Sequence, residues 1–120
     1  MDTRDGGLLR WQWSLYADGH HNRRNLLVHA ATNPLLLAGT CALVASPLAG
    51  ADFAGAGAGL MLVAMMAQGR GHRLEKTAPV PFRGVGDLLA RFFAEQWVTF
   101  PRFVLSGGFA AAWRVAKRAT

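Results

Sequence analysis

The chain has four histidines, and all of them lie near the ends of one long apolar stretch. Residues 30–69 contain a single charged side chain, that of Asp52, and are predicted to form an apolar hairpin. Because a hairpin returns to the side that it left, the histidines before it and the histidine after it are expected to meet. Several imidazoles at one point are typical of a metal site. The four histidines are His20, His21, His29 and His72.

Helical spacing places partner side chains beside these histidines. Residues four or seven apart share one face of a helix. One such face carries His21, Asn25 and His29, and another carries Gln68, His72 and Glu75. Imidazole with carboxylate binds iron, zinc, copper or manganese, and two histidines with one carboxylate are the ligands of non-haem Fe(II) oxygenases. We therefore predict a metal site with Glu75 as its acidic group and with Asn25 and Gln68 orienting the ligands.

Each of these residues also has a structural interpretation that the sequence leaves open. A histidine at a membrane interface commonly contacts only headgroups. Glu75 could form an ion pair with Arg73 or Lys76. Asn25 could cap a helix, and the side chain of Gln68 could reach toward water. For any single histidine the structural interpretation is favoured, whereas three histidines together with one carboxylate favour a site.

The elements that position these side chains are predicted from the apolar pattern. A soluble domain of 120 residues must cover itself with polar side chains, and here 52% of the residues are hydrophobic and 17% charged. Residues 22–49 and 53–68 are predicted to be membrane helices joined by a turn over 46–52. The second would rise only ~24 Å against a hydrocarbon core of ~30 Å. It can span only if it continues toward Arg73, if the bilayer thins, or if protein shelters it.

Flanking segments complete the expected fold. Residues 87–100 are amphipathic and predict a helix on the membrane surface or across the bundle. Residues 103–115 are apolar but contain Gly107 and Gly108, which favours a re-entrant or interfacial helix. The aromatic cluster of residues 11–16 fits a membrane interface or a small core equally well. The predicted fold is all-α: one membrane domain over 1–120, with a hairpin at about 30–69 and C-terminal helices at about 85–117.

The basic residues indicate an orientation in the membrane. The net charge is +6, and arginines and lysines lie before and after the hairpin but not in its turn. By the positive-inside rule both ends of the hairpin are expected to be cytoplasmic, in a multi-pass protein of a bacterial inner membrane. Nucleic-acid binding is not expected, because the basic residues are dispersed and no reader motif is present.

Cysteine and glycine usage narrows the remaining possibilities. The single Cys41 allows no disulfide framework, and the N-terminal region, which contains Asp2, Asp5 and Asp18 and no long apolar run, does not resemble a signal peptide. The glycines at 55, 57 and 59 are predicted to form a packing face for another helix, with a homo-oligomer through Gly55 and Gly59 as one outcome.

Two sequence blocks resemble a known family. The first is Tyr16-Ala-Asp-Gly-His20-His21-Asn22-Arg23-Arg24-Asn25-Leu-Leu-Val-His29, and the second is Gln68-Gly-Arg-Gly71-His72-Arg-Leu-Glu75-Lys-Thr-Ala-Pro79. They resemble the Tyr-x3-His-x4-Asn-x3-His and Gln-x2-Gly-His signatures of the small membrane 2-hydroxy fatty acid dioxygenases of phytosphingosine breakdown. The resemblance covers roughly residues 11–105. The chain departs from the family pattern at Arg23, where proline is usual, near Thr32, where a glycine is usual, and in the spacing from His72 to Glu75.

The resemblance implies a helical membrane protein that uses Fe(II) and O2 to shorten a 2-hydroxy fatty acid by one carbon. It implies His20, His29 and His72 as iron ligands, with His21 less directly matched. It implies Asn25, Gln68 and Glu75 as supporting positions. Arg24, Arg70 and Arg73 either attract the substrate carboxylate or only reflect the orientation of the hairpin in the membrane.

Two further functions remain open on the sequence. One is a non-catalytic membrane protein that packs with a partner through its glycine-rich helix face. The second is zinc-dependent hydrolysis by the same ligands.

Overall fold

The computed structural model describes residues 4–116, and within that range it contains helices and no strand. The elements are α1 (Leu8–Tyr16), the 3₁₀ turn η1 (Ala17–Gly19), α2 (Arg23–Ala49), α3 (Ala51–His72), α4 (Val85–Ala94), the π-helical segment η2 (Glu95–Thr99), α5 (Phe100–Leu105) and α6 (Gly108–Val115). The predicted all-α class is confirmed. The predicted domain 1–120 and the predicted C-terminal helices to 117 include residues 1–3 and 117–120, which lie outside the described part.

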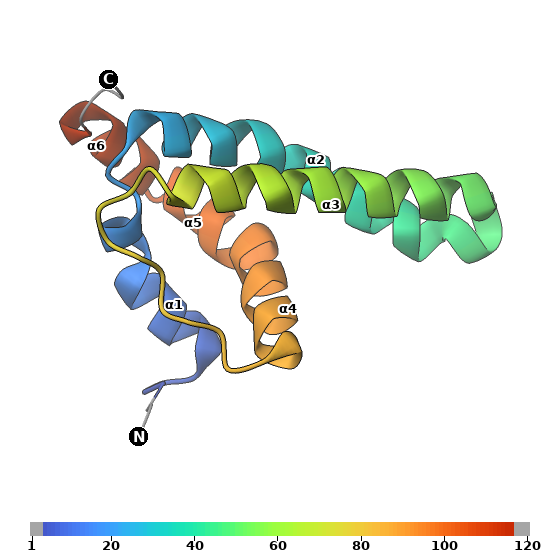
Figure 1. The fold of residues 1–120 in the computed structure, drawn as a ribbon, viewed down its shortest axis with the longest axis horizontal. Helices are drawn as coiled ribbons and strands as arrows, with labels where there is room; N and C mark the ends of the chain where they lie inside the picture. Colours follow the sequence, from blue (N-terminus) through green and yellow to red (C-terminus); the bar gives the residue numbers. More distant parts are fainter. Residues whose placement is uncertain (1–3, 117–120) are drawn as a thin grey trace.

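Helices α2 and α3 form a long antiparallel hairpin (Figure 1). The side chain of Asn22 begins α2 by accepting hydrogen bonds from the main-chain N–H groups of Arg24 and Asn25. The turn is confined to Gly50, whose φ of 118° is readily adopted only by glycine. Gly39 and Gly57 bring the two helices together, because a Cβ on Gly57 would lie 2.5 Å from the carbonyl oxygen of Gly39. The predicted glycine packing face therefore lies partly inside the hairpin.

Both hairpin helices are long and apolar enough to cross a membrane. Helix α3 starts at Ala51 and continues to His72, so its 22 residues rise about 33 Å, enough for a hydrocarbon core of ~30 Å. The short span predicted for residues 53–68 is thereby extended at both ends. Near the turn the apolar side chains face outward, and Leu48 is 98% exposed.

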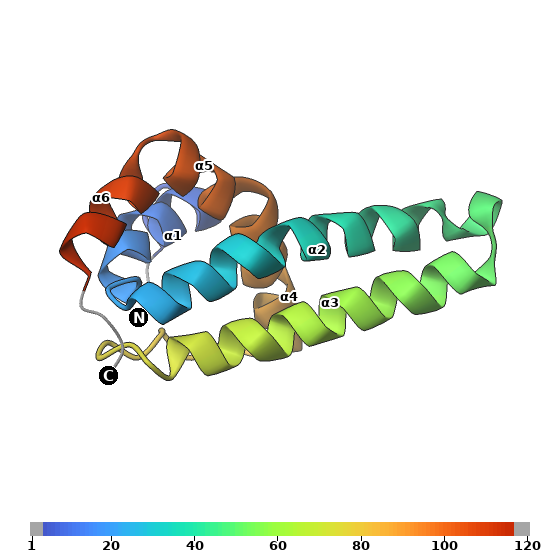
Figure 2. The same ribbon diagram turned by 90° about the horizontal axis from the view of Figure 1, so that it is seen from above.

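The remaining helices pack against one half of the hairpin and leave the other half projecting (Figure 2). Their core contains Tyr16, Leu26, Phe100, Phe103 and Ala116, with Trp13, Phe109, Ala112 and Trp113 packed around it. Part of the aromatic cluster at 11–16 therefore belongs to a protein core. Figure 1 shows α1 and α4 diverging from the hairpin, with the segment between α3 and α4 passing over α1 to the start of α4.

Helices α4 and α5 are connected through η2 into one helical run. Pro101 has no N–H and cannot make the regular hydrogen bond to the preceding turn, which is consistent with the π-helical register just before it. The apolar segment 103–115 is not one helix. Gly107 adopts a left-handed conformation with φ of 85° and separates α5 from α6.

Candidate metal centre

Three of the four histidines and one glutamate meet at the base of the hairpin. His20, His29, His72 and Glu95 each offer one ligand atom, and these atoms all lie within 4.8 Å of one another. His20 follows η1 and His29 lies in α2, while His72 ends α3 and Glu95 begins η2. Four separate elements therefore form the cluster. Ligands ~2.1 Å from a shared ion are at most ~4.2 Å apart, so the cluster is slightly wider than a loaded site.

The hydrogen bonds of two histidines show which nitrogen faces the centre. Nδ1 of His20 lies 2.6 Å from the carbonyl oxygen of Tyr16, and Nδ1 of His29 lies 3.0 Å from that of Asn25. A carbonyl oxygen only accepts, so each Nδ1 carries a proton and each Nε2 of the neutral ring carries a lone pair. Both Nε2 atoms are buried and have no hydrogen-bond partner. Unpaired buried acceptors cost about 1–3 kcal/mol each, and a metal ion between them would satisfy both.

Glu95 supplies the carboxylate of the cluster. Its Oε2 accepts a hydrogen bond from the Tyr16 hydroxyl at 2.8 Å and lies 3.4 Å from Nε2 of His29. The hydrogen bond from Tyr16 leaves the other lone pairs of the Glu95 carboxylate for a ligand between it and the histidines. An ionised carboxylate is the form that binds metals.

The surroundings of His20 keep it in the neutral form that a metal requires. Burial, together with the nearby His29, lowers the pKa of His20 to about 3. The Tyr16 ring stacks on the His20 ring with 4.0 Å between centroids. Burial and the Glu95 carboxylate raise the pKa of Tyr16, so its hydroxyl stays protonated and donates to Glu95.

Glu75, the acidic group expected from the sequence, lies elsewhere. Its carboxylate accepts hydrogen bonds from the main-chain N–H groups of His21 at 2.7 Å and Asn22 at 3.1 Å, and from Nδ2 of Asn25 at 2.7 Å. It thereby ties the chain after α3 to the start of α2. His21 is exposed and is not among the four residues of the cluster. The structure thus puts Glu95 where the sequence placed Glu75.

Asn25 supports the cluster through its main chain. Its carbonyl oxygen receives the Nδ1 proton of His29, and its side chain, which is fully buried, binds Glu75. The cap of α2 is Asn22, not Asn25. Asn25 therefore orients one histidine and connects it to the end of α3.

Gln68 belongs to a buried network of amides one turn from His72. Its Nε2 donates to Thr32 Oγ1 at 2.9 Å, and it exchanges two hydrogen bonds with Gln96 at 2.7 and 3.1 Å. Asn33 Nδ2 donates to the carbonyl oxygen of Gln96 at 2.8 Å. The network joins α2, α3 and η2 beside the cluster, so Gln68 is buried and does not reach toward water.

The cluster residue that the sequence missed is Glu95, and the network partner that it missed is Gln96. They are consecutive polar residues within the amphipathic pattern 87–100, to which the sequence analysis assigned no part of the site. The signal that could have found Glu95 is that Leu88, Phe92 and Glu95 share one helix face.

A cavity of about 460 Å³ adjoins the cluster. It is bordered by α1, the end of α3, the segment 77–82 and α4, and its walls are mainly apolar. The cluster residues that line it are His20, His72 and Glu95. Of the arginines and lysines in the described part of the chain, only Arg91 lines this cavity. Arg24, Arg70 and Arg73, which were candidates for attracting a carboxylate, are exposed and lie outside it.

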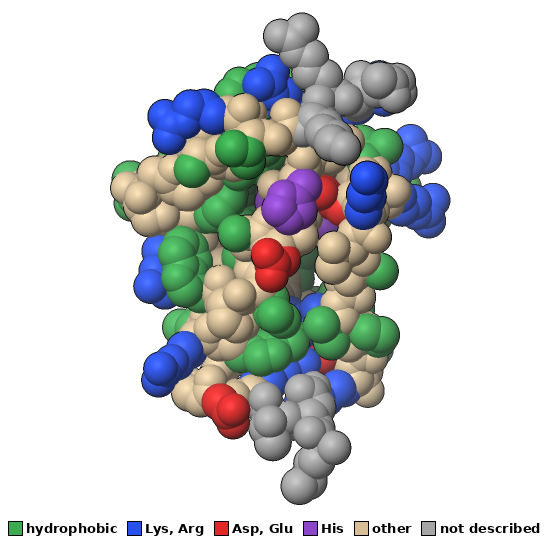
Figure 3. Space-filling view, turned by 90° about the vertical axis from the view of Figure 1, so that its left-hand side faces the viewer, with side chains coloured by type: hydrophobic (Ala, Val, Ile, Leu, Met, Phe, Trp, Pro, Cys, Tyr) green, Lys and Arg blue, Asp and Glu red, His purple; other side chains and the backbone are tan. Residues whose placement is uncertain are grey.

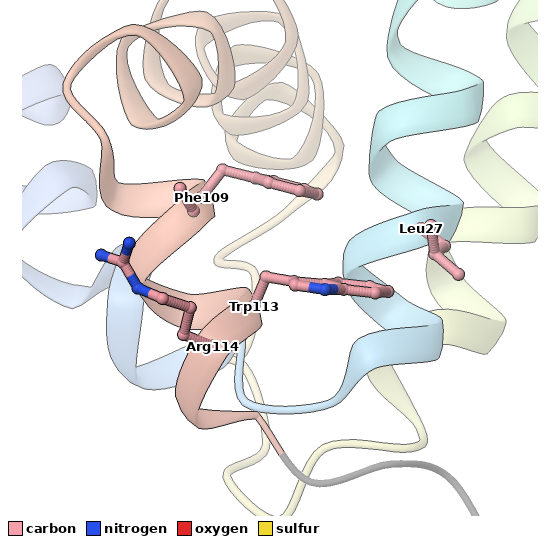
Figure 4. A pocket seen from close by; sticks show the side chains of 5 residues that line it. Leu27, Phe109, Trp113 and Arg114 are labelled. Carbon is pink, nitrogen blue, oxygen red and sulfur yellow. The ribbon is translucent and has the colours of Figure 1, made fainter.

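A second hollow of about 370 Å³ lies between α2 and α6. Figure 4 shows Phe109 and Trp113 side by side on α6, with Leu27 of α2 across the gap. It contains none of the cluster residues. On the face of the molecule shown in Figure 3, basic side chains are spread around the edges and do not form one patch.

No protein-family model, curated protein or solved structure matches the chain. The interpretation of the centre therefore depends on its own residues.

Proposed function

We propose that this protein is an Fe(II)-dependent dioxygenase of a membrane, acting on 2-hydroxy fatty acids. The observation that supports this most strongly is the cluster itself: three imidazoles and one carboxylate beside an apolar cavity. The resemblance of residues 16–29 and 68–79 to the dioxygenase signatures supports the same reaction. In that reaction a 2-hydroxy fatty acid and O2 give the acid one carbon shorter, CO2 and water, which balances without a further reductant.

The number of ligands favours iron over zinc. Zinc sites are mostly tetrahedral, and a hydrolytic zinc keeps its fourth position for water. Four protein ligands would close such a site. His20, His29, His72 and Glu95 would together hold Fe(II), which accepts more ligands than zinc and so could bind substrate and O2 as well. When bound, this iron would supply the redox chemistry that activates O2.

The side chains of the protein have separate tasks in this proposal. The main-chain carbonyls of Tyr16 and Asn25 orient His20 and His29, and the Tyr16 hydroxyl holds the carboxylate of Glu95. The apolar walls of the cavity contact the alkyl chain and exclude water from the reacting end. The amide network of Gln68 and Gln96 holds α3 against η2 beside the cluster.

The hairpin provides the membrane location in this proposal. Its two helices would cross the bilayer, with both ends at the cytoplasmic face of a bacterial inner membrane. Since the histidines are at those ends, the cavity would lie near the headgroup plane, where a fatty acid carboxylate resides. Lipid or fatty acid substrates would then reach it from the bilayer.

The test combines metal content with turnover. Protein purified in a mild detergent should bind about one equivalent of iron and consume O2 while converting 2-hydroxypalmitate to the acid one carbon shorter. The variant His72→Ala should lose both properties, and the matched control His21→Ala should keep both, because His21 is exposed and outside the cluster. Normal metal content in both His29→Ala and His72→Ala would exclude a shared site.

A second candidate function is a non-catalytic membrane protein that packs with another helix. It is favoured by Gly55 and Gly59, because a Cβ at either position would meet nothing within 4 Å. Under this alternative, Gly59→Leu should dissociate a complex in cross-linking experiments. Iron content should then be absent in the unmodified protein as well.

A further inference from the structure

Arg91 lies on the cavity face of α4, one helical turn before Glu95. The two residues are four apart in a continuous helical run, which separates them by ~6 Å along the axis. Both line the cavity. A ligand there can therefore contact Arg91 and the cluster at the same time.

The Arg91 guanidinium is held rigidly at the cavity wall. The residue is 9% exposed, and its guanidinium carbon lies 4.2 Å from the centroid of the Phe82 ring and 5.2 Å from that of Trp11. Its Nη1 donates to the carbonyl oxygen of Pro81 at 3.2 Å and lies 3.6 Å from Oδ2 of Asp87. A side chain fixed in this way loses little entropy when it binds a ligand.

The guanidinium of Arg91 is only partly paired with other groups of the protein. A guanidinium has five N–H donors, and Arg91 makes one hydrogen bond with good geometry, to Pro81. Its acidic neighbour Asp87 is shared, because Asp87 also accepts two hydrogen bonds from Arg4 and one from the main-chain N–H of Arg83. Donors of Arg91 thus remain for an anion in a cavity whose walls are otherwise mainly apolar.

We propose that Arg91 binds the anionic head of a single-chain amphiphile in this cavity, namely the carboxylate of a fatty acid. The reaction of the bound acid rests on the proposed function, whereas binding of its carboxylate by Arg91 does not. With the carboxylate on Arg91, the adjoining carbons lie on the side of Glu95 and the histidines. The exposed Arg24, Arg70 and Arg73 have no part in this contact.

A phospholipid, like a fatty acid, combines an anionic head, its phosphate, with an apolar tail. The carboxylate is favoured because a planar guanidinium matches it in a bidentate manner. A cavity of about 460 Å³ is also in the range that holds one small ligand, not a diacyl lipid.

The experiment measures ligand binding to metal-free protein in a neutral maltoside detergent by calorimetry. The probes are 2-hydroxydecanoate, its uncharged methyl ester, and decyl phosphate. The unmodified protein should bind the acid more tightly than the ester. In Arg91→Met the affinity for the acid should fall about 10- to 100-fold, to the level of the ester, while the ester is unaffected. The control Arg70→Met should bind all three probes as the unmodified protein does.

Two further variants keep the test decisive if Arg91→Met does not fold. Arg91→Lys should bind the acid with intermediate affinity, because it keeps the charge and loses the planar fork. Asp87→Asn should bind the acid more tightly, since it removes the competing carboxylate. Equal binding of acid and ester by the unmodified protein, unchanged acid affinity in Arg91→Lys, or weaker acid binding in folded Asp87→Asn would overturn the proposal. Tighter binding of decyl phosphate than of the acid would overturn the choice of a carboxylate.

Failure here is separable from failure of the proposed function. The binding measurements need no metal, whereas the proposed function is decided by iron content and turnover. A protein that loads iron but shows no role for Arg91 would refute only this inference.

Discussion

Replacing each of the two candidate carboxylates by an amide distinguishes a role in metal binding from a role in folding stability alone. Glu95→Gln keeps the shape of the side chain and a hydrogen-bond acceptor for Tyr16, but it removes the negative charge from the cluster. Glu75→Gln makes the same chemical change at a carboxylate that instead holds the start of α2. The two variants are therefore matched in chemistry and differ in position.

The expected size of the Glu95 effect follows from linkage between binding and folding. A metal present at 100 times its Kd stabilises the folded protein by about 2.7 kcal/mol. Loss of an outer partner of a ligand commonly weakens binding 10- to 100-fold, and loss of a charged ligand should weaken it at least 100-fold. At the same metal concentration the stabilisation would then fall to about 0.4 kcal/mol. For a chain of this length the difference corresponds to about 9 °C in Tm.

The Glu75 variant should behave in the opposite way. Glutamine has one acceptor oxygen, whereas Glu75 accepts three hydrogen bonds with its two oxygens. The free energy of unfolding should fall by about 1–3 kcal/mol, with or without metal. The rise in Tm on adding metal should remain as in the unmodified protein.

The assay is thermal unfolding in detergent under anaerobic conditions, with increasing Fe(II) or with Mn(II) as a redox-stable substitute. The informative quantity is the metal-induced change in Tm, because a substitution that destabilises the metal-free and the metal-bound protein equally leaves it unchanged. If Glu95→Gln kept the full metal-induced rise, or if Glu75→Gln lost it, the assignment of Glu95 as a ligand would be refuted.

Three more predictions follow from particular contacts. Tyr16→Phe removes the hydrogen bond to the cluster carboxylate and should weaken metal binding about 10- to 100-fold in a metal titration; unchanged affinity would contradict the role of the hydroxyl. Gly57→Ala should destabilise the hairpin by about 1–3 kcal/mol in chemical unfolding, because its Cβ meets the main chain of α2, whereas Gly59→Ala should not destabilise it. The hydrogen bond from Arg4 holds the pKa of Asp87 well below its ordinary 3.8, so the stability from this pair is complete above that pH and is lost as the pH falls below it. Asp87→Asn should therefore flatten the acid side of the unfolding profile, and an unchanged acid profile would show that the pair contributes nothing.

Much of the fold was predictable because its causes are local. The apolar run with one charged residue predicts two long helices, and the turn needs only a glycine at its tip. The ends of the helices were less predictable. Helix α3 continues past Gly69 because α2 lies beside it, and α5 ends where Gly107 adopts a left-handed conformation. The π-helical register of η2 is consistent with Pro101 and with the amide network, which forms only on packing.

The sequence by itself determined the kinds of side chain present and that His20, His29 and His72 come to one end of a hairpin, because helix formation and chain reversal depend on neighbouring residues. Only the tertiary structure decided which carboxylate joins them. Glu75 follows one helical segment and Glu95 lies in another, and the helix face that Glu95 shares with Leu88 and Phe92 does not by itself place it at the histidines. The choice depends on how α4 and η2 pack against the hairpin, which is a contact between segments far apart in sequence. The same packing encloses the cavity and directs Arg91 into it.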